Sequence, residues 1–567
     1  MISGDPLNNH YNYFKDKSMT ILKKYRFSLI SLAILIAFVG LITYYRVNIQ
    51  MNIGPIWDTY DFLSDALLFA GQGTGYSDLT RPPLLPFLTS IFFRLGYISP
   101  AAIFIVDGLL FIFGVVGLFL LLKLRFNNIE SFLGSILYAT FPIVISFAGV
   151  GLSDIPSVSF SIWSIYFTIL AVKRNSKFFY LSFPLMMLAF LTRYPSALLI
   201  FPLSLYILSN KDSIKEIRDI IIGIGISVLL LIPVLIFSYD VFGNPFYSFI
   251  NFFGSSSGAA TGALAYNPDL LYFIKNLPSF IGAQGVTILI IIFCFIVYEF
   301  MRFKSRKSLH IPQINKNMKI KLILLIILSF VFLGTFGKLF WVESEILFFL
   351  IGYLLYNLSK NWNIKSMDLH LLMFTWFMSF FIFHSVYAVK TERYFVTMAP
   401  ALVYFLILGI DHISNRIIFK IRNINVTSHL FSIILIFMVL LSLTFYLPGI
   451  QEENNNLKIM NENADLASQW LINYDPSYKT KIIYSNLWPY SGWYMKMNIG
   501  MMPIFNNGQR YYTGARDYSP NQQDNIETNN YLVNNSVYYY FSILQELNLT
   551  SYKPIKQFGN IIIYKRV

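Results

Sequence analysis

The chain has 567 residues, of which 56% are hydrophobic, 18% aromatic and only 13% charged. A water-soluble protein of this length has no interior large enough for so much apolar surface, so the composition predicts an integral membrane protein. The formal charge of +14 does not indicate a nucleic-acid partner, because the Lys and Arg residues fall in short clusters between apolar runs. The single cysteine, Cys294, excludes an intramolecular disulfide framework and a multi-cysteine metal site.

Apolar runs along residues 27–448 predict a polytopic α-helical membrane domain with about thirteen transmembrane helices. The first run follows a polar leader, residues 1–26, and lacks a small-residue cleavage signature, so we expect a retained span rather than a removed signal peptide. The expected spans lie near residues 27–45, 101–122, 130–148, 155–172, 178–192, 195–209, 218–239, 278–300, 320–338, 341–358, 368–388, 394–412 and 428–447.

The positions of the basic residues predict the sidedness of these spans. Clusters of Lys and Arg occur in the leader and after alternate spans, so they share one face, and the positive-inside rule makes that face cytoplasmic. We therefore expect a multi-pass protein of the cell membrane with a cytoplasmic N-terminus. The exterior face then receives residues 46–100, 151–154, 240–277, 338–345, 387–393 and the C-terminus.

The composition changes from residue 449 onward, where apolar runs shorten and Asn, Tyr, Asp and Lys become more frequent. Residues 457–474 have helical periodicity, and the segments 481–484, 536–540 and 560–564 have the pattern of strands. Residues 449–567 are therefore expected to form a soluble, mixed α/β domain on the exterior side.

Three acids in the first expected exterior loop (residues 46–100), Asp58, Asp61 and Asp65, are spaced i, i+3 and i+7. They share one face if the segment is helical, and apolar residues on the other side predict an amphipathic helix on the membrane surface. Exposure to water is the simpler interpretation of Asp61 and Asp65, although Asp61 and the neighbouring Tyr60 are candidates to support a site. Asp58 opens the segment beside an interfacial Trp, with further ionisable groups expected on its side, and is the candidate catalytic carboxylate.

Arg81 precedes two prolines, Pro82 and Pro83, in the same loop. Proline fixes its own backbone and restricts the residue before it, so the approach to the next segment is stiff. The planar guanidinium of Arg81 suits phosphate oxygens. The alternative is an interfacial anchor for the helix that follows.

Asp154 lies in Ser153-Asp154-Ile155-Pro156, at the exterior start of an expected span. It could serve only as a helix N-cap. An acid at this depth is nevertheless costly unless it is paired or used, so Asp154 is a second candidate catalytic residue. Asp58 and Asp154 together could hold a divalent cation, Mg²⁺ or Mn²⁺, whereas one Asp and an Arg can act without a metal.

Two later exterior segments carry further candidates. Arg193 breaks two short spans, and Arg393 opens a later span; both are candidates to contact a phosphate group. Membrane anchoring, or a surface pair between Glu392 and Arg393, is the competing interpretation. His384 lies on an apolar span, where a packed core histidine is the simpler interpretation than a ligand.

The sequence has no Walker loop, HExxH, GxSxG or dinucleotide fingerprint. An exterior site has no nucleotide sugar or ATP to use, and the activated donor available there is a sugar on a polyprenyl phosphate carrier. The alternative from another class is a membrane transporter or lipid flippase, which would carry ionisable residues near the middle of broken spans. Here the ionisable residues gather at the exterior ends of the spans.

In their order and sidedness these segments resemble the GT-C superfamily of polyprenyl-phosphate-dependent glycosyltransferases, with the protein O-mannosyltransferase and aminoarabinose-transferase branch most similar. The resemblance implies that Asp58 is the base, that Arg81 contacts the donor phosphate, and that Asp154 supports the site or a metal. It also implies an inverting transfer to a hydroxyl of a protein, lipid or glycan acceptor. Many relatives have Asp-Glu where this chain has Asp58-Thr59, and Lys where it has Arg81. A second acid must therefore come from elsewhere, such as Asp61 or Asp154.

Overall fold

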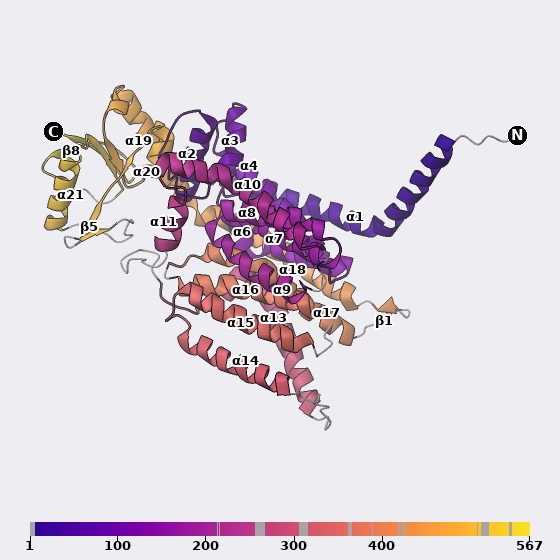
Figure 1. The fold of residues 1–567 in the computed structure, drawn as a ribbon. Coiled ribbons are helices and arrows are strands. Elements are labelled where there is room, and N and C mark those ends of the chain that lie inside the picture. Colours follow the sequence, from indigo (N-terminus) through magenta and orange to yellow (C-terminus); the bar gives the residue numbers. More distant parts are fainter. Residues whose placement is uncertain are drawn as a thin grey trace.

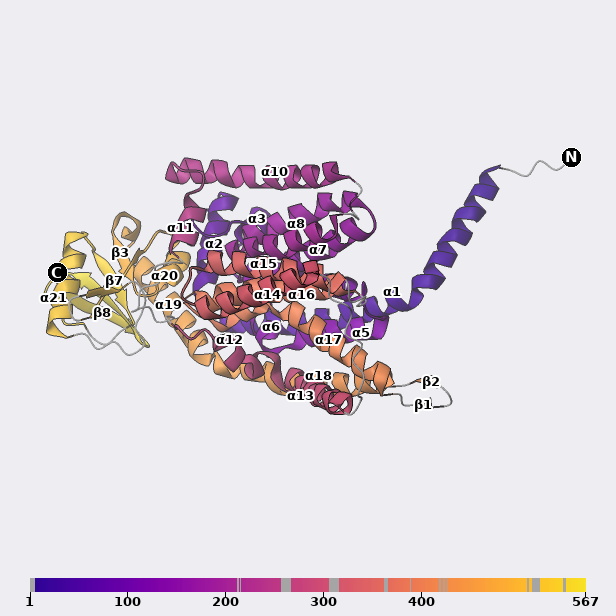
Figure 2. The ribbon, with the colours of Figure 1, turned by 60° about the horizontal axis from the view of Figure 1, so that its bottom comes forward.

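The computed structural model describes residues 6–211, 214, 216–255, 267–304, 316–360, 366–387, 389–417, 420–421, 424–425, 427–506, 509–511, 521–543 and 547–567. A bundle of helices carries a smaller region of helices and strands at one end (Figure 1). The beginning of the first helix extends from the opposite end of the bundle, and the rotated view shows the same arrangement (Figure 2).

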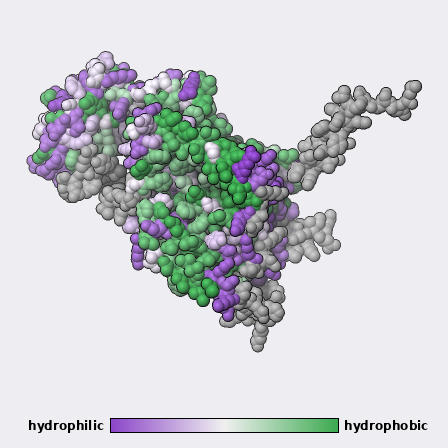
Figure 3. Space-filling model, in the orientation of Figure 1, coloured by the Kyte–Doolittle hydropathy of each residue, from purple (hydrophilic) through white to green (hydrophobic). Residues whose placement is uncertain are grey.

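Nine helices within the described ranges are long and apolar enough to cross a membrane. Hydrophobic side chains cover the flank of the bundle, between a hydrophilic C-terminal region and hydrophilic patches at the other end (Figure 3). The chain is therefore a multi-pass membrane protein. The long helices are α1 (Pro6–Ile53), α4 (Ala101–Leu122), α7 (Asp154–Lys173), α10 (Ile217–Phe242), α13 (Leu277–Lys304), α14 (Lys316–Thr335), α15 (Trp341–Ser359), α16 (Met367–Val386) and α18 (Thr427–Glu453).

Several of the other expected spans correspond to shorter or interrupted helices. Phe141 shows the cause of one interruption: it precedes Pro142, takes an extended conformation with ψ of 132°, and ends the helix before it. The shorter elements are α5 (Asn128–Thr140), α6 (Pro142–Phe147), η1 (Ser176–Phe178), α8 (Phe179–Thr192), η2 (Tyr194–Leu199), α9 (Ile200–Ser209), η5 (Glu392–Thr397) and α17 (Ala399–Arg416).

The first loop forms two helices, α2 (Trp57–Ala70) and α3 (Leu84–Arg94), at the end of the bundle that carries the C-terminal region (Figure 1). Gly71, with φ of +69°, ends α2 in the left-handed conformation that favours glycine. The helix is present as expected, but the exposure expected for Asp61 and Asp65 is wrong: these side chains are 4% and 2% exposed. Two short helices, α11 (Tyr247–Ser255) and α12 (Tyr272–Lys275), lie between the long helices α10 and α13.

The C-terminal region contains a five-stranded sheet of order β4-β3-β7-β9-β8. Strand β3 runs parallel to β4 and β7, whereas β9 is antiparallel to β7 and β8. Its strands are β3 (Ile483–Ser485), β4 (Gly500–Met501), β7 (Tyr539–Ser542), β8 (Tyr552–Phe558) and β9 (Ile561–Arg566). The helices of this region are α19 (Asn455–Tyr474), η6 (Tyr478–Thr480), α20 (Trp488–Met495) and α21 (Gln522–Asn534), and β5 (Ile504–Asn506) pairs with β6 (Gln509–Tyr511). A separate pair, β1 (Lys420–Ile421) with β2 (Ile424–Asn425), lies between α17 and α18 at the other end of the bundle (Figure 2).

The first loop and the C-terminal region share one hydrophobic core, separate from that of the bundle. Leu63 and Leu67 of α2 belong to the same buried cluster as Leu471 of α19 and Trp493 of α20. The buried amide of Asn461 on α19 also donates hydrogen bonds to backbone carbonyls between α1 and α2. The C-terminal region therefore fixes the position of α2, the helix that carries Asp58.

Candidate active site

A cavity of about 260 Å³ lies at the end of the bundle where α2 begins. Segments far apart in the sequence meet there: α2, the loop before α3, the start of α7, the turn between α8 and η2, α11, the end of α16, and η5. The cavity is lined by Asp58, Phe62, Asp78, Thr80, Arg81, Pro82, Ser153, Arg193, Tyr194, Pro195, Ser248, Asn251, Phe252, Phe383, His384, Tyr387, Arg393 and Tyr394. Five of the residues singled out from the sequence are therefore among its walls.

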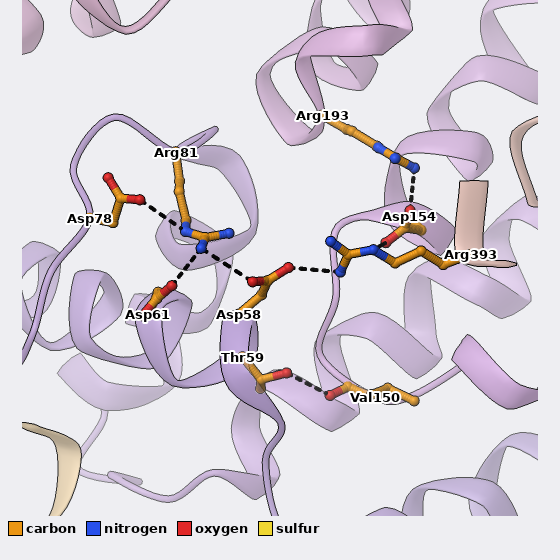
Figure 4. A network of polar contacts seen from close by, with 9 residues as sticks. All are labelled: Asp58, Thr59, Asp61, Asp78, Arg81, Val150, Asp154, Arg193 and Arg393. Carbon is orange, nitrogen blue, oxygen red and sulfur yellow. Dashed lines mark hydrogen bonds and ion pairs between the residues drawn. The ribbon is translucent and has the colours of Figure 1, made fainter. Parts of the chain in front are cut away.

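Asp58 is held between two guanidinium groups (Figure 4). Arg81 Nη2 lies 3.2 Å from Asp58 Oδ1, and Arg393 Nη1 donates to Asp58 Oδ2 at 2.7 Å. Burial raises the pKa of Asp58, but the opposite charges of Arg81 and Arg393 outweigh burial and hold this pKa well below its usual range. The carboxylate is therefore ionised, and both of its oxygens face a cation.

Asp154 forms a second cluster beside the first. Its Oδ1 pairs with Arg193, and its Oδ2 lies 3.9 Å from Arg393 Nε. Arg393 thus stands between the two carboxylates expected from the sequence (Figure 4). Asp154 is the first residue of α7 and pairs with Arg193, and no side-chain hydrogen bond caps that helix.

Arg81 is surrounded by acids. In addition to Asp58, its Nη2 lies 2.7 Å from Asp61 Oδ2, and its Nε lies 3.3 Å from Asp78 Oδ2. Burial, together with nearby carboxylates, raises the pKa of Asp61 to about 7 against the opposing charge of Arg81. Asp78 was not singled out from the sequence. In the structure it accepts hydrogen bonds from Thr80 N and Thr80 Oγ1, which is the pattern of an Asx turn. An Asp that can form such a turn three residues before Arg81 is the sequence signal that could have found it.

His384 is buried, which agrees with its simpler interpretation as a core residue, yet its ring also lines the cavity. It stacks on Tyr394 with ring centroids 4.6 Å apart, and the Arg193 guanidinium lies 4.9 Å from the centroid of the same tyrosine. Tyr394 thus connects His384 to the arginines through ring contacts.

Tyr60 and Glu392 lie outside the cavity walls. The Tyr60 hydroxyl donates to Asn461 Oδ1 at 2.8 Å and lies 2.8 Å from the Tyr494 hydroxyl, so it joins α2 to the C-terminal region. Glu392 is exposed, and the neighbouring Arg393 pairs with Asp58 and not with Glu392 across the surface.

The expected Mg²⁺ or Mn²⁺ site at Asp58 and Asp154 does not fit these residues. Both carboxylates already have the Arg393 guanidinium against them, at 2.7 Å and 3.9 Å. Across the part of the chain that the structure describes, no three His, Cys, Asp or Glu side chains come together as metal ligands. Hard cations take six or more oxygens, whereas here the positive charge facing both acids is a guanidinium.

The site of this multi-pass membrane protein is thus a cavity lined by three arginines, and guanidinium groups suit anionic oxygens. Residues 80–237 match the family model described as dolichyl-phosphate-mannose-protein mannosyltransferase. No curated protein sequence matches the chain.

Solved structures of low sequence identity share the fold. ArnT from Cupriavidus metallidurans in the apo state matches with a TM-score of 0.55 at 11% identity, over 94% of this chain and 98% of that one. The same enzyme bound to undecaprenyl phosphate gives a TM-score of 0.54 at 10% identity, over the same shares, 94% and 98%. The Archaeoglobus fulgidus oligosaccharyltransferase in the apo form matches with a TM-score of 0.50 at 13% identity, over 92% of this chain and 70% of that one.

The chain therefore has the fold of ArnT and of this oligosaccharyltransferase, and part of it matches a mannosyltransferase family model.

Proposed function

We propose that this protein is a membrane glycosyltransferase, not a transporter or lipid flippase, and that it transfers one sugar from a polyprenyl-phosphate carrier to an acceptor hydroxyl in the cavity at Asp58, with inversion at the anomeric carbon. The observation that carries the proposal is a single carboxylate paired with both Arg81 and Arg393 in one cavity. The undecaprenyl phosphate bound to ArnT and the dolichyl-phosphate-mannose of the family model support this donor class. The acceptor is a hydroxyl of a protein, a lipid or a glycan.

The reaction is a single displacement. The acceptor oxygen attacks the anomeric carbon while its proton passes to a carboxylate oxygen of Asp58. The bond between the anomeric carbon and the carrier phosphate breaks, and the phosphate leaves with the bonding electrons. Arg81 and Arg393 offset the negative charge that grows on the phosphate. Since the positive charges come from these arginines, no step requires a metal ion.

Donor binding also prepares the base. While both guanidinium groups pair with Asp58, its pKa is too low for efficient proton acceptance. An incoming phosphate competes for Arg81 and Arg393, which weakens both ion pairs and raises the pKa of Asp58 toward its ordinary value. The carboxylate therefore becomes a better base once the donor is bound.

An apolar groove of about 510 Å³ offers a place for the polyprenyl chain. Pro83 lines the groove and directly follows Pro82, which lines the cavity; Leu191 lines the groove two residues before Arg193 of the cavity. A phosphate bound by Arg81 therefore has an apolar surface beside it. The groove is lined by Phe69, Pro83, Leu84, Phe87, Arg94, Leu188, Leu191, Leu229, Leu230, Pro233, Val234 and Phe237.

Filling this groove is expected to weaken binding of long-chain donors. Leu188→Trp or Val234→Trp should raise the KM for an undecaprenyl-phosphate-linked sugar about tenfold or more, because each displaced methylene costs about 0.8 kcal/mol. The KM for a donor with a two-isoprene chain should stay within about twofold, because that chain buries few methylenes there. Ile221→Trp is the matched control, because Ile221 lies on α10, as Val234 does, but its side chain is 65% exposed. An equal change for both chain lengths would contradict the assignment.

The pKa of Asp61 predicts a pH dependence of donor binding. With a pKa of about 7, Asp61 is neutral below pH 7 and becomes a carboxylate above it. The charged form competes with the donor phosphate, a singly charged diester throughout this range, for Arg81. The donor KM should therefore rise as the pH increases from 6 to 8, and Asp61→Asn should flatten this rise. An unchanged pH profile in Asp61→Asn would assign the dependence to another group.

The overall proposal is tested with purified protein and radiolabelled sugars on polyprenyl phosphate, by measuring sugar release and transfer with and without EDTA. We expect release from at least one donor, and the same rate in EDTA. No release from any polyprenyl-phosphate sugar would refute the function. Loss of activity in EDTA, restored by Mg²⁺ or Mn²⁺, would refute metal-free transfer alone.

We also propose that the cavity and the C-terminal region lie on the exterior face. The alternation of basic clusters supports this sidedness, and thiol labelling in intact cells tests it.

A further inference from the structure

Two buried charges in long apolar helices have no part in the mechanism above. Arg46 lies in α1 and Asp107 in α4, with exposed fractions of 3% and 0%. A charged group at such a position is costly unless polar partners satisfy it. Both side chains have partners in one segment, residues 145–151, which runs from the end of α6 toward α7. Arg46 also donates to Gln50 Oε1 on its own helix at 3.0 Å.

Asp107 holds the end of this segment. Its Oδ2 accepts hydrogen bonds from Val150 N at 2.9 Å and Gly151 N at 2.8 Å. Gly149 and Gly151 have φ of +69° and +81°, so the backbone is in the left-handed region on both sides of Val150. A carboxylate that accepts from two consecutive amides keeps this otherwise unusual turn in one conformation.

Arg46 holds the beginning of the same segment. Its Nε donates to the Ile145 carbonyl at 3.0 Å, and its Nη2 donates to the Ser146 carbonyl at 2.8 Å. A guanidinium group thus binds the carbonyls at one end of the segment, and a carboxyl group accepts from the amides at the other. Each side chain satisfies backbone groups that the turn would otherwise leave unpaired.

The segment contacts the elements that carry both carboxylates of the site. Thr59, the residue after Asp58, donates from Oγ1 to the Val150 carbonyl at 3.2 Å (Figure 4). Gly151 precedes Asp154 by three residues, and a Cβ placed on it would lie 2.9 Å from Thr59 Cγ2. The turn that Asp107 and Arg46 hold therefore contacts the residue next to Asp58 and leads directly into Asp154.

We propose that Asp107 and Arg46 are positioning residues for glycosyl transfer: by clamping residues 145–151, they set the placement of Asp58 and Asp154 around Arg393. This inference rests on the proposed function. Arg81 takes its position from Asp61 and Asp78, outside the clamped segment. Loss of the clamp therefore affects the placement of the base more than the binding of the phosphate, and small misplacements of reacting groups cost about 10²-fold in rate.

The test compares Asp107→Asn with Asp107→Leu. The amide oxygen of Asn still accepts from both backbone amides, and its NH₂ takes the place of Oδ1, which has no hydrogen-bond partner among the described residues. We expect kcat for sugar release to fall less than about fivefold in Asp107→Asn and about 10²-fold in Asp107→Leu. Undecaprenyl phosphate is the binding probe. It should bind both variants within about threefold of the parent, because Arg81 and Arg393, which bind the phosphate, keep their positions.

Thr59→Val provides a second variant in case Asp107→Leu does not fold. It is isosteric, leaves both buried charges in place and removes only the hydrogen bond to Val150. Its kcat should fall about fivefold, the cost of one hydrogen bond, with unchanged probe binding and a thermal midpoint only about a few degrees below that of the parent.

Hydrogen–deuterium exchange separates failure of this inference from failure of the proposed function. In Asp107→Leu, exchange should increase in residues 149–155 and at the start of α2, whether or not a sugar donor has been found. Unchanged exchange at α2, or a kcat within twofold of the parent in both folded Asp107→Leu and Thr59→Val, would overturn the inference. A parent enzyme that releases no sugar would refute the proposed function alone.

Discussion

Asp58→Asn is expected to lower the rate of transfer by about 10³–10⁴-fold while leaving the donor phosphate bound as tightly as in the parent, or more tightly. The amide has the shape of the carboxylate but takes up no proton from the acceptor hydroxyl. It also releases Arg81 and Arg393 from their ion pairs with Asp58, at 3.2 Å and 2.7 Å, so both guanidinium groups become free for phosphate. The measurements are kcat for sugar transfer and the affinity for undecaprenyl phosphate.

Asp78→Asn is the matched control for this substitution. Asp78 also lines the cavity and lies 3.3 Å from Arg81, so it loses the same charge beside the same guanidinium. We expect it to change the donor KM but to leave kcat within about fivefold, because Asp78 accepts no proton. If Asp58→Asn kept a tenth of the parent rate, or if both variants lost kcat equally, Asp58 would not be the base.

Several site residues were predictable because membrane physics restricts where charges occur. An ionisable side chain between apolar runs must lie near the end of a span or be paired. Four site residues met that condition: Asp58, Arg81, Arg193 and Arg393. Counting the expected spans between them assigned all four to the same side of the membrane. The structure brings all four to one cavity.

The pairing of these residues was not predictable, because it depends on how helices far apart in sequence pack. Nothing near Arg393 in the sequence points to Asp58, 335 positions away. Asp61 and Asp65 have the spacing of a water-facing stripe, but both are buried, and Asp61 pairs with Arg81 from the loop that follows α2. Asp107 was overlooked, although an acid inside an apolar run is itself a sign of a paired or functional group; what the sequence could not predict is that its partners are the amides of Val150 and Gly151.

The break expected between residues 178–192 and residues 195–209 is present in the structure. Helix α8 ends before Arg193, which takes an extended conformation with φ of −155° and ψ of 116°, and η2 and α9 follow it. The sequence did not predict that this break brings Arg193 to Asp154, because that pairing depends on how α7 and α8 pack.

Arg393→Gln is expected to lower kcat/KM by about 10³-fold, the effect of removing one group that stabilises developing charge. The guanidinium contacts Asp58 at 2.7 Å and lies 3.9 Å from Asp154, so its loss leaves two carboxylates without the cation between them. The phosphate loses a bidentate partner at the same time. Arg393→Lys should recover part of the rate, because it restores the charge without the planar fork.

A matched control and a double variant make this expectation specific. Arg125 pairs with Asp411 at 3.1 Å away from the cavity, so Arg125→Gln removes an ion pair of the same kind and should leave the rate within about threefold. If Arg393 acts partly through Asp58, the combined Asp58→Asn and Arg393→Gln variant should be far less impaired than the product of the single effects. Independent, multiplicative losses would mean that Arg393 serves the phosphate alone and that its contact with Asp58 has no part in catalysis.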